Sequence, residues 1–173
     1  MMQLTAAARA VGGTAPGTDA AFVGVGTDSR KIAAGELFVA LKGEHFDGHD
    51  YVAEVIAKGA AGAMVELGWA QKHGAGLPLI AVDDTKAALG RLAANWRDRF
   101  DIPVIGVTGS NGKTTVKEMI AAILAAAYGP DDCLATAGNF NNDIGLPLTL
   151  LRLRAKHRAA VIELGMNHPG ETA

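Results

Sequence analysis

Residues 102–120 read IPVIGVTGSNGKTTVKEMI, and this stretch holds the residue types that bind phosphate. The common phosphate-binding loop has the pattern G-x-x-x-x-G-K-[ST], in which backbone N–H groups surround the phosphates and the lysine reaches them. Counted back from Gly112-Lys113-Thr114, the first glycine would fall at position 107, which is valine. The nearest glycines are Gly106 and Gly109. The stretch is therefore a phosphate loop in another register, or a glycine-rich turn without a ligand.

The residues on either side of the loop favour the hypothesis that it binds phosphate. An apolar strand at 103–108 leads in, and a helix at 113–127 leads out with one apolar stripe, formed by Val116, Met119, Ile120, Ile123 and Leu124. Small residues between them let backbone N–H groups turn toward an anion at the helix N-terminus, where the helix dipole favours negative charge. Lys113 would reach the β and γ phosphates, and the Thr114 hydroxyl would be a ligand of Mg²⁺.

Two later segments carry polar groups that could complete such a site. A predicted apolar strand ends in Glu163, whose carboxylate can bind Mg²⁺; a cap for the following turn is the alternative. Asn139, Asn141 and Asn142 cluster before a predicted helix. Asparagine is common in turns for local hydrogen-bonding reasons, yet the same amides could donate to a phosphate or a substrate. The composition slightly favours the turn.

The rest of the chain supplies the elements that would hold these residues. Strands that alternate with helices predict an α/β fold with a mainly parallel sheet. Pro103 separates a finished helix from a new apolar run, so we predict one small α/β domain in residues 1–101 and the first part of another in residues 102–173. Helices are predicted at 4–11, 51–60, 83–100 and 113–127 and around Pro147, and strands within 22–41 and at 62–66, 78–82, 103–108, near 133–136 and at 159–164.

Composition excludes several classes of protein. The 173 residues carry a net charge of −2 and 5% aromatic residues, so neither a basic surface nor stacking platforms for nucleic acid are expected. No apolar run approaches the roughly 18 residues that a membrane helix needs. The N-terminus lacks the pattern of a secretory signal, and the single Cys133 excludes an internal disulfide framework. We therefore expect a cytoplasmic protein without membrane insertion.

Taken together, the quoted loop and the segments TDSRKIAAGELFVALKGEHFDGHDYV, ATAGNFNNDIGLPLTLL and IELGMNHPGE resemble the Mur ligase family. Members are ATP-dependent amide ligases of peptidoglycan precursor synthesis, and their loop has glycines at the places of Gly106, Gly109 and Gly112. The last two segments resemble the member that adds D-Ala-D-Ala to UDP-MurNAc-tripeptide through an acyl phosphate. The alternatives are another Mur-type ligase, either amino-acid-adding or folylpolyglutamate-like, a different P-loop phosphotransferase, and a non-catalytic UDP-substrate-binding module.

The resemblance implies a UDP-substrate-binding domain in residues 1–101 and the first part of a P-loop ATPase domain in residues 102–173. That second region has only about three predicted strands, whereas nucleotide-binding sheets usually have five or six. We therefore expect an N-terminal piece of a longer, monomeric enzyme that is inactive by itself. ATP and Mg²⁺ are the implied cofactors.

The resemblance also assigns roles to individual residues. Thr114 and Glu163 would hold Mg²⁺, and the catalytic set would be Lys113, Asn139, Glu163 and His168, although a lone histidine is as often a loop hydrogen-bonding residue. The ATP loop would comprise Gly109, Ser110, Asn111, Gly112, Lys113, Thr114 and Thr115. The UDP-substrate would contact Thr27, Asp28, Ser29, Arg30, Lys42, Gly43, His45, Phe46, Asp47 and Asn142, and a polar surface loop is the alternative for most of them.

Overall fold

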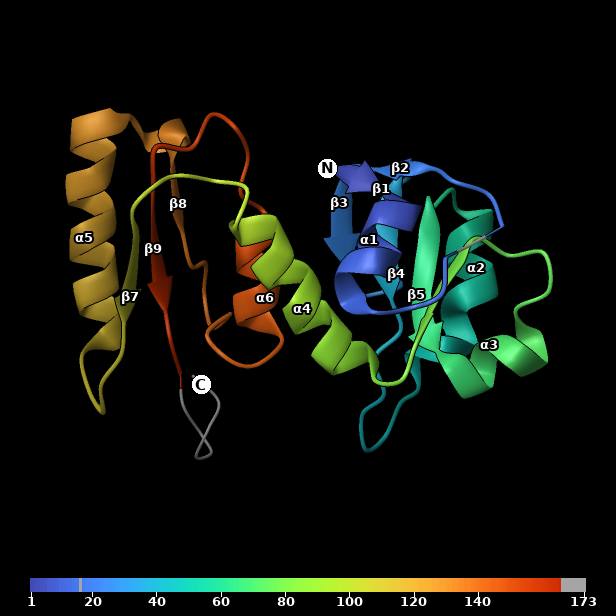
Figure 1. Ribbon diagram of the computed structural model, residues 1–173. Coiled ribbons are helices and arrows are strands. Elements are labelled where there is room, and N and C mark those ends of the chain that lie inside the picture. The colour runs from blue at the N-terminus through green and yellow to red at the C-terminus, as the bar shows by residue number, and fades with distance from the viewer. Residues whose placement is uncertain (16, 166–173) are drawn as a thin grey trace. The chain divides into compact units, whose positions relative to one another are not determined.

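The computed structural model describes residues 1–15 and 17–165, and the chain forms two compact units, Met1–Leu92 and Ala93–Ala173 (Figure 1). The units divide inside helix α4 (Thr85–Arg97). Both units combine helices with parallel strands, so the predicted α/β class is confirmed. The domain boundary predicted after residue 101 stays a prediction.

The first unit is built on a four-stranded parallel sheet in the order β3-β4-β5-β6. Its strands are β3 (Gly24–Gly26), β4 (Glu36–Val39), β5 (Gly62–Glu66) and β6 (Leu79–Val82). Two short strands, β1 (Met2–Gln3) and β2 (Ala21–Phe22), pair antiparallel beside it. β4 and β6 are almost continuously apolar and buried, as strands covered on both faces are.

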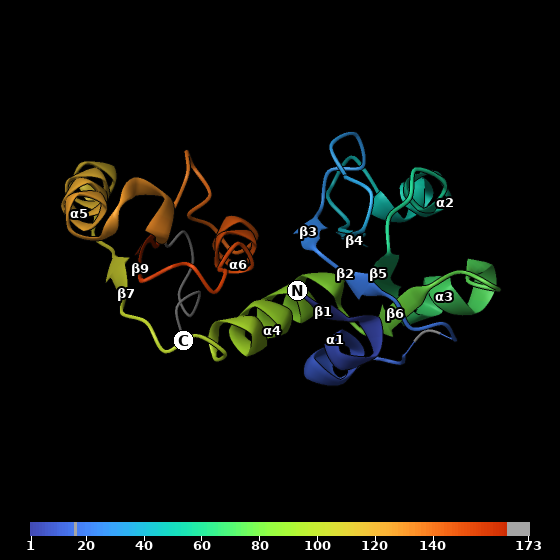
Figure 2. The ribbon, with the colours of Figure 1, turned by 90° about the horizontal axis from the view of Figure 1, so that it is seen from above.

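Helices cover both faces of this sheet (Figure 2). α1 (Leu4–Val11) packs on β6 and ends at Gly12, whose φ of 68° is left-handed. On the other face α2 (Val52–Ala57), which follows the short 3₁₀ helix η1 (Gly48–Tyr51), inserts Val52 and Val55 against Phe38 and Ala63. α3 (Leu67–His73) is not predicted from the sequence, because it has no fully buried residue and therefore little apolar periodicity.

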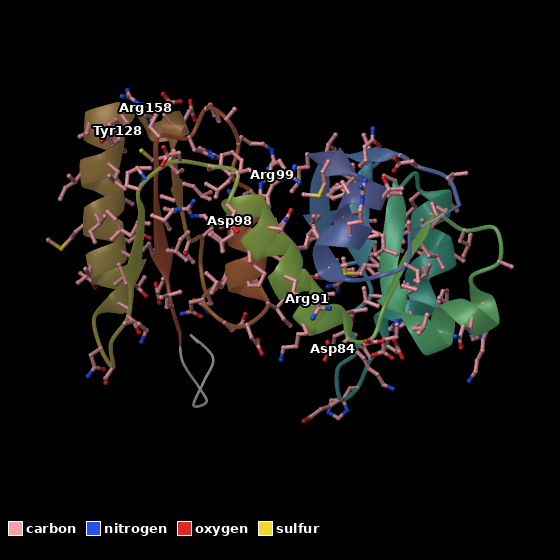
Figure 3. The ribbon with its side chains drawn as sticks, viewed as in Figure 1. Asp84, Arg91, Asp98, Arg99, Tyr128 and Arg158 are labelled. Atoms are coloured by element: carbon pink, nitrogen blue, oxygen red, sulfur yellow. The ribbon has the colours of Figure 1, made fainter. Side chains whose placement is uncertain are left out.

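Helix α4 follows its sequence pattern closely. Leu89, Leu92 and Trp96 are buried, as their helical spacing predicts. At its start Asp84 accepts a hydrogen bond from the Ala87 N–H at 2.9 Å, which caps the helix. Arg91 Nε donates to the carbonyl of Val11 at 3.0 Å, so this helix is tied to the end of α1; Asp84 and Arg91 are labelled in Figure 3.

The second unit has a three-stranded parallel sheet in the order β7-β9-β8. Its central strand β9 (Ala159–Glu163) is buried along its whole length, and α5 and α6 both pack against it. Figures 1 and 2 place these two helices on opposite sides of the sheet. The other elements are β7 (Val104–Val107), α5 (Lys113–Tyr128), the 3₁₀ turn η2 (Pro130–Asp132), β8 (Cys133–Ala135) and α6 (Gly145–Leu150).

The apolar stripe of α5 is largely exposed. The exposed fraction is 46% for Val116, 62% for Met119 and 67% for Ile123. Lys117, paired with Glu118, is only 1% exposed instead. Residues three apart share a helix face, so the contact that Thr114 makes at the end of β9 also turns Lys117 inward. The loop, rather than the stripe, sets the rotation of this helix.

Candidate functional site

The loop between β7 and α5 has the backbone geometry that its glycines allow. Gly109 has φ of 141° and Gly112 has φ of 75°, both in the region that other residues rarely adopt. Lys113 begins α5, and its Nζ donates to the carbonyl of Gly109 at 2.7 Å, which holds the amine over the loop. Gly106 lies in β7 opposite Ile162 rather than in the loop. The turn therefore uses Gly109 and Gly112, which explains why position 107 can be valine.

The strand order brings Glu163 to this loop. β9 lies beside β7 in parallel, and the register pairs Val107 with Glu163, so both strands end at the same edge. The Thr114 hydroxyl donates to Glu163 Oε1 at 3.2 Å. The start of α5 and the end of β9, which are 49 residues apart in the sequence, therefore meet at one carboxylate.

The Glu163 carboxylate is buried and incompletely satisfied. The residue is 2% exposed, and its backbone N–H donates to the buried Thr136 hydroxyl at 2.9 Å. Asn141 Nδ2 donates to Oε1 at 2.9 Å, whereas Oε2 has no hydrogen-bond partner among the described residues. A buried carboxylate oxygen without a partner is energetically costly, and a cation would compensate it.

These residues fit a magnesium ion. Mg²⁺ commonly takes one or two protein ligands together with phosphate oxygens and water rather than a cage of side chains. Residues 1–15 and 17–165 contain no group of three or more His, Cys, Asp or Glu residues arranged for a metal. The Glu163 oxygen and the Thr114 hydroxyl match the smaller ligand set.

The three asparagines take different positions. Asn142 Oδ1 accepts hydrogen bonds from the N–H groups of Ile144 and Gly145, at 3.3 and 2.8 Å, and so acts as a turn residue just before α6. Asn139 is exposed. Asn141, which sequence reasoning did not select for a role, contacts Glu163. Its only sequence signal was membership of the cluster. His168 lies outside the described residues.

The first unit contains an open cleft of about 470 Å³. Five predicted residues line it: Thr27, Asp28, Ser29, Arg30 and Phe46. Phe38, Gly48 and Tyr51 also line it and were missed, because they lie in an apolar strand and around a 3₁₀ helix that look purely structural in the sequence. The cleft combines aromatic rings with hydroxyls and one guanidinium group.

Asp28 and Arg30 form a two-bond ion pair in this cleft. Arg30 Nε donates to Asp28 Oδ1 at 2.8 Å and Nη2 donates to Oδ2 at 2.9 Å. The hydrogen bonds from the Arg30 side chain and backbone lower the pKa of Asp28 to about 2. Asp28 is therefore ionised at neutral pH, and it orients the exposed Arg30 side chain.

The other predicted residues of the first unit, Lys42, Gly43, His45 and Asp47, are not among those lining the cleft in the described chain. Lys42 pairs with Asp47 in an isolated antiparallel bridge, and Gly43 N–H donates to the Phe46 carbonyl at 2.9 Å. A Cβ on Gly43 would lie 2.4 Å from Phe46 Cε1. This turn therefore places the Phe46 ring against Gly43.

Asp47 ties the same turn to the fold. It accepts from the backbone N–H of His49 at 2.9 Å, and its Oδ1 lies 2.5 Å from His49 Nδ1. Burial acts to raise the pKa of Asp47, but the His49 hydrogen bonds outweigh it and the pKa is lowered. His49 Nε2 accepts a hydrogen bond from the Glu66 N–H at 3.0 Å, so the ring proton is on Nδ1, which donates a hydrogen bond to Asp47.

None of the helices in the described part of the chain has the length and apolar content needed to cross a membrane.

Two family profiles match the sequence: the Mur ligase middle domain over residues 107–173, and the Mur ligase family catalytic domain over residues 21–97. The chain is 49% identical over 148 residues to UDP-N-acetylmuramoyl-tripeptide–D-alanyl-D-alanine ligase of Haemophilus influenzae, covering 85% of this chain and 32% of that protein. Its identity to the Escherichia coli protein of the same name is 48% over 161 residues, covering 93% and 34%. The chain thus spans about a third of the length of these curated relatives.

Solved structures give the same result. MurF from Acinetobacter baumannii matches with a TM-score of 0.84 and 41% identity, covering 97% of this chain and 36% of that one. The MurF ligase from Thermotoga maritima, in complex with ADP, matches with a TM-score of 0.74 and 32% identity, covering 86% and 33%. The similarity therefore extends from the sequence motifs to the folded structure.

Proposed function

This chain belongs to the Mur ligase family, and we propose that it contributes the substrate cleft and the phosphate loop of an ATP-dependent ligase. The reaction is the addition of D-Ala-D-Ala to UDP-MurNAc-tripeptide through an acyl phosphate. The observation that carries the proposal is the meeting of Thr114 with the buried Glu163 beside the glycine loop. The names of the curated relatives and of the ADP-bound neighbour support the choice of reaction and nucleotide.

In this proposal the loop from Gly109 to Thr115 holds the ATP phosphates. The left-handed glycines turn backbone N–H groups toward the anion, and the start of α5 adds its dipole. Lys113 leaves the Gly109 carbonyl for the phosphates, an exchange that costs little because the amine already lies over the loop. Thr114 and Glu163 would hold Mg²⁺, which when bound screens the charge of the phosphates.

The chemistry needs this positive charge because two anions must react. The terminal carboxylate of the tripeptide attacks the γ phosphorus of ATP, which forms an acyl phosphate and releases ADP. The amine of D-Ala-D-Ala then attacks the acyl carbon, and phosphate leaves as the amide bond forms. Lys113 stabilises the charge that develops on the transferred phosphoryl group, and Asn139 lies on the exposed turn from which an amide can reach the substrate.

The cleft of the first unit would bind the UDP part of the substrate. Phe46 and Tyr51 offer rings for the base, and the Thr27 and Ser29 hydroxyls with Arg30 offer donors for the diphosphate. Asp28 keeps the guanidinium in place. We further propose a cytoplasmic, monomeric protein that does not act on nucleic acid, in line with the net charge of −2.

Separate titrations test the proposal on the 173-residue chain. Calorimetry with UDP-MurNAc-tripeptide should give binding that Arg30→Met weakens and Lys113→Met does not. Calorimetry with a non-hydrolysable ATP analogue and Mg²⁺ should give the opposite dependence. Nucleotide binding that is unchanged by Lys113→Met would refute the phosphate loop. Binding of the UDP ligand that survives Arg30→Met unchanged would refute the assignment of the cleft.

A further inference from the structure

Asn141 is the residue whose position the proposed function does not yet explain. A turn asparagine usually bonds to backbone groups close by in the sequence, as Asn142 does. Asn141 instead sends its amide to a residue 22 positions later, the Glu163 carboxylate, at 2.9 Å. An ionised carboxylate can accept hydrogen bonds but cannot donate them, so the part of the Asn141 amide that faces it must be the NH₂ group.

The backbone around Asn141 is fixed from the opposite side. Gly165, two residues beyond Glu163, donates its N–H to the carbonyl of Asn141 at 2.7 Å. A Cβ on Gly165 would lie 3.0 Å from that carbonyl oxygen and 3.1 Å from Asn141 Cγ. Any side chain at position 165 would force the asparagine turn to shift by a few tenths of an ångström. The turn is therefore anchored on both sides of Glu163.

The hydrogen bonds on Glu163 are unevenly distributed. Both side-chain donors, Thr114 Oγ1 and Asn141 Nδ2, point at Oε1, and Oε2 has no partner among the described residues. Thr114 lies in the first turn of α5 and belongs to the nucleotide loop, so it is part of the phosphate site itself. Asn141 comes from the separate turn before α6 and contacts the carboxylate without belonging to the loop.

We propose that Asn141 is a positioning residue, which holds Glu163 through Oε1 so that Oε2 is presented to the divalent cation of the nucleotide site. This inference rests on the proposed function, because it requires the cation site. Residues that orient a metal ligand typically change metal affinity by about 10- to 100-fold when they are replaced. Asn141 acts only through Glu163, so its effect disappears once the Glu163 charge is removed.

The test uses Mn²⁺ as the probe, together with a non-hydrolysable ATP analogue, on the 173-residue chain. Electron paramagnetic resonance measures bound Mn²⁺ directly, and calorimetry measures nucleotide affinity with and without the ion. Asn141→Leu keeps the shape but removes the donor, and it should weaken Mn²⁺ binding about tenfold or more while leaving metal-free nucleotide binding unchanged. Asn95→Leu, on α4, is the matched control, and thermal unfolding reports on folding.

A double-mutant cycle tells positioning from a direct role. In the Glu163→Gln background, Asn141→Leu should cause no further loss. An additional loss there, or Mn²⁺ binding by Asn141→Leu equal to that of the unsubstituted chain, overturns the inference. If Asn141→Leu does not fold, Asn141→Ala, which removes the same donor, replaces it; unchanged Mn²⁺ binding by that variant likewise overturns the inference. A chain that shows no Mn²⁺-dependent nucleotide binding before any substitution refutes the proposed function itself.

Discussion

The two units hold candidate sites that treat charge in opposite ways. In the first unit the Asp28 carboxylate is matched by Arg30 within one exposed loop, two residues apart. In the second, the Glu163 carboxylate is buried, receives hydrogen bonds only from neutral donors in the described chain, and keeps one oxygen without a partner. The first site is complete by itself, whereas the second needs a cation to be complete.

This difference indicates which substitutions should have large effects on ligand binding. Exposed ion pairs contribute little to stability because water screens them and their side chains lose entropy. A buried carboxylate is costly to leave without compensation, so whatever binds there gains a large interaction. The cleft should therefore respond mildly to substitution, and the loop site should respond strongly.

The largest effect is expected for Glu163→Gln. This change removes the buried charge but retains an acceptor for Asn141 and Thr114, so the divalent-cation-dependent part of ATP-analogue binding should fall about 100-fold. The midpoint of thermal unfolding in the absence of metal should change little. Calorimetry and thermal unfolding measure the two quantities, with the exposed Glu54→Gln as control. Parallel losses of binding and folding would make Glu163 a structural residue and erase the contrast between the sites.

Lys113→Met should give the next largest effect. A hydrogen bond to a charged group contributes about 2 kcal/mol, which corresponds to roughly a 30-fold loss of nucleotide affinity. Stability should be retained, because the Nζ bond to the Gly109 carbonyl is partly exposed. Calorimetry with the ATP analogue measures the loss, and Lys72→Met in α3 is the control. An equal loss in both variants would mean that general charge, rather than the loop, attracts the nucleotide.

Arg30→Met should have a smaller effect, confined to the first unit. Its guanidinium is already engaged by Asp28, so only part of its hydrogen-bonding capacity is available, and about a tenfold loss of UDP-MurNAc-tripeptide affinity is expected. Calorimetry with that ligand provides the measurement, and Arg99→Met, which removes a guanidinium group over the Trp96 ring, is the control. An unchanged affinity would contradict the assignment of this cleft to the UDP ligand.

The smallest expected effect concerns the loss of stability at acidic pH. In the folded protein the pKa of Asp28 is about 2, below its usual value of 3.8, so its contribution to stability is fully present above pH 3.8 and is lost as the pH falls toward 2. Asp28→Asn should therefore lower the unfolding midpoint slightly at neutral pH and make no difference near pH 2, so that the pH dependence between about pH 5 and 2 becomes flatter. Thermal unfolding across that range measures it. A midpoint difference between the two chains that varies with pH near pH 7 would show that another group titrates with the cleft.

Local patterns predicted most of the elements. The strand before the loop, α5, α6 and β9 all lie where the apolar runs, Pro147 and the glycines indicate. Helix α3 was missed because it is only partly buried, and its sequence therefore lacks a clear apolar stripe. The rotation of α5 could not be predicted, since periodicity identifies an apolar face but cannot say whether that face is the one that packs.

The candidate site in the second unit was likewise only partly predictable from the sequence. Sequence alone determined the loop, because Gly109 and Gly112 impose their backbone geometry locally, and it identified Glu163 as an acid at the end of a strand. The folded structure was needed to show that Asn141, rather than Asn139 or Asn142, contacts this acid, and that Phe38 and Tyr51 line the cleft. The physical reason is that turn geometry depends on neighbouring residues, whereas these contacts depend on strand order and on segments distant in the sequence.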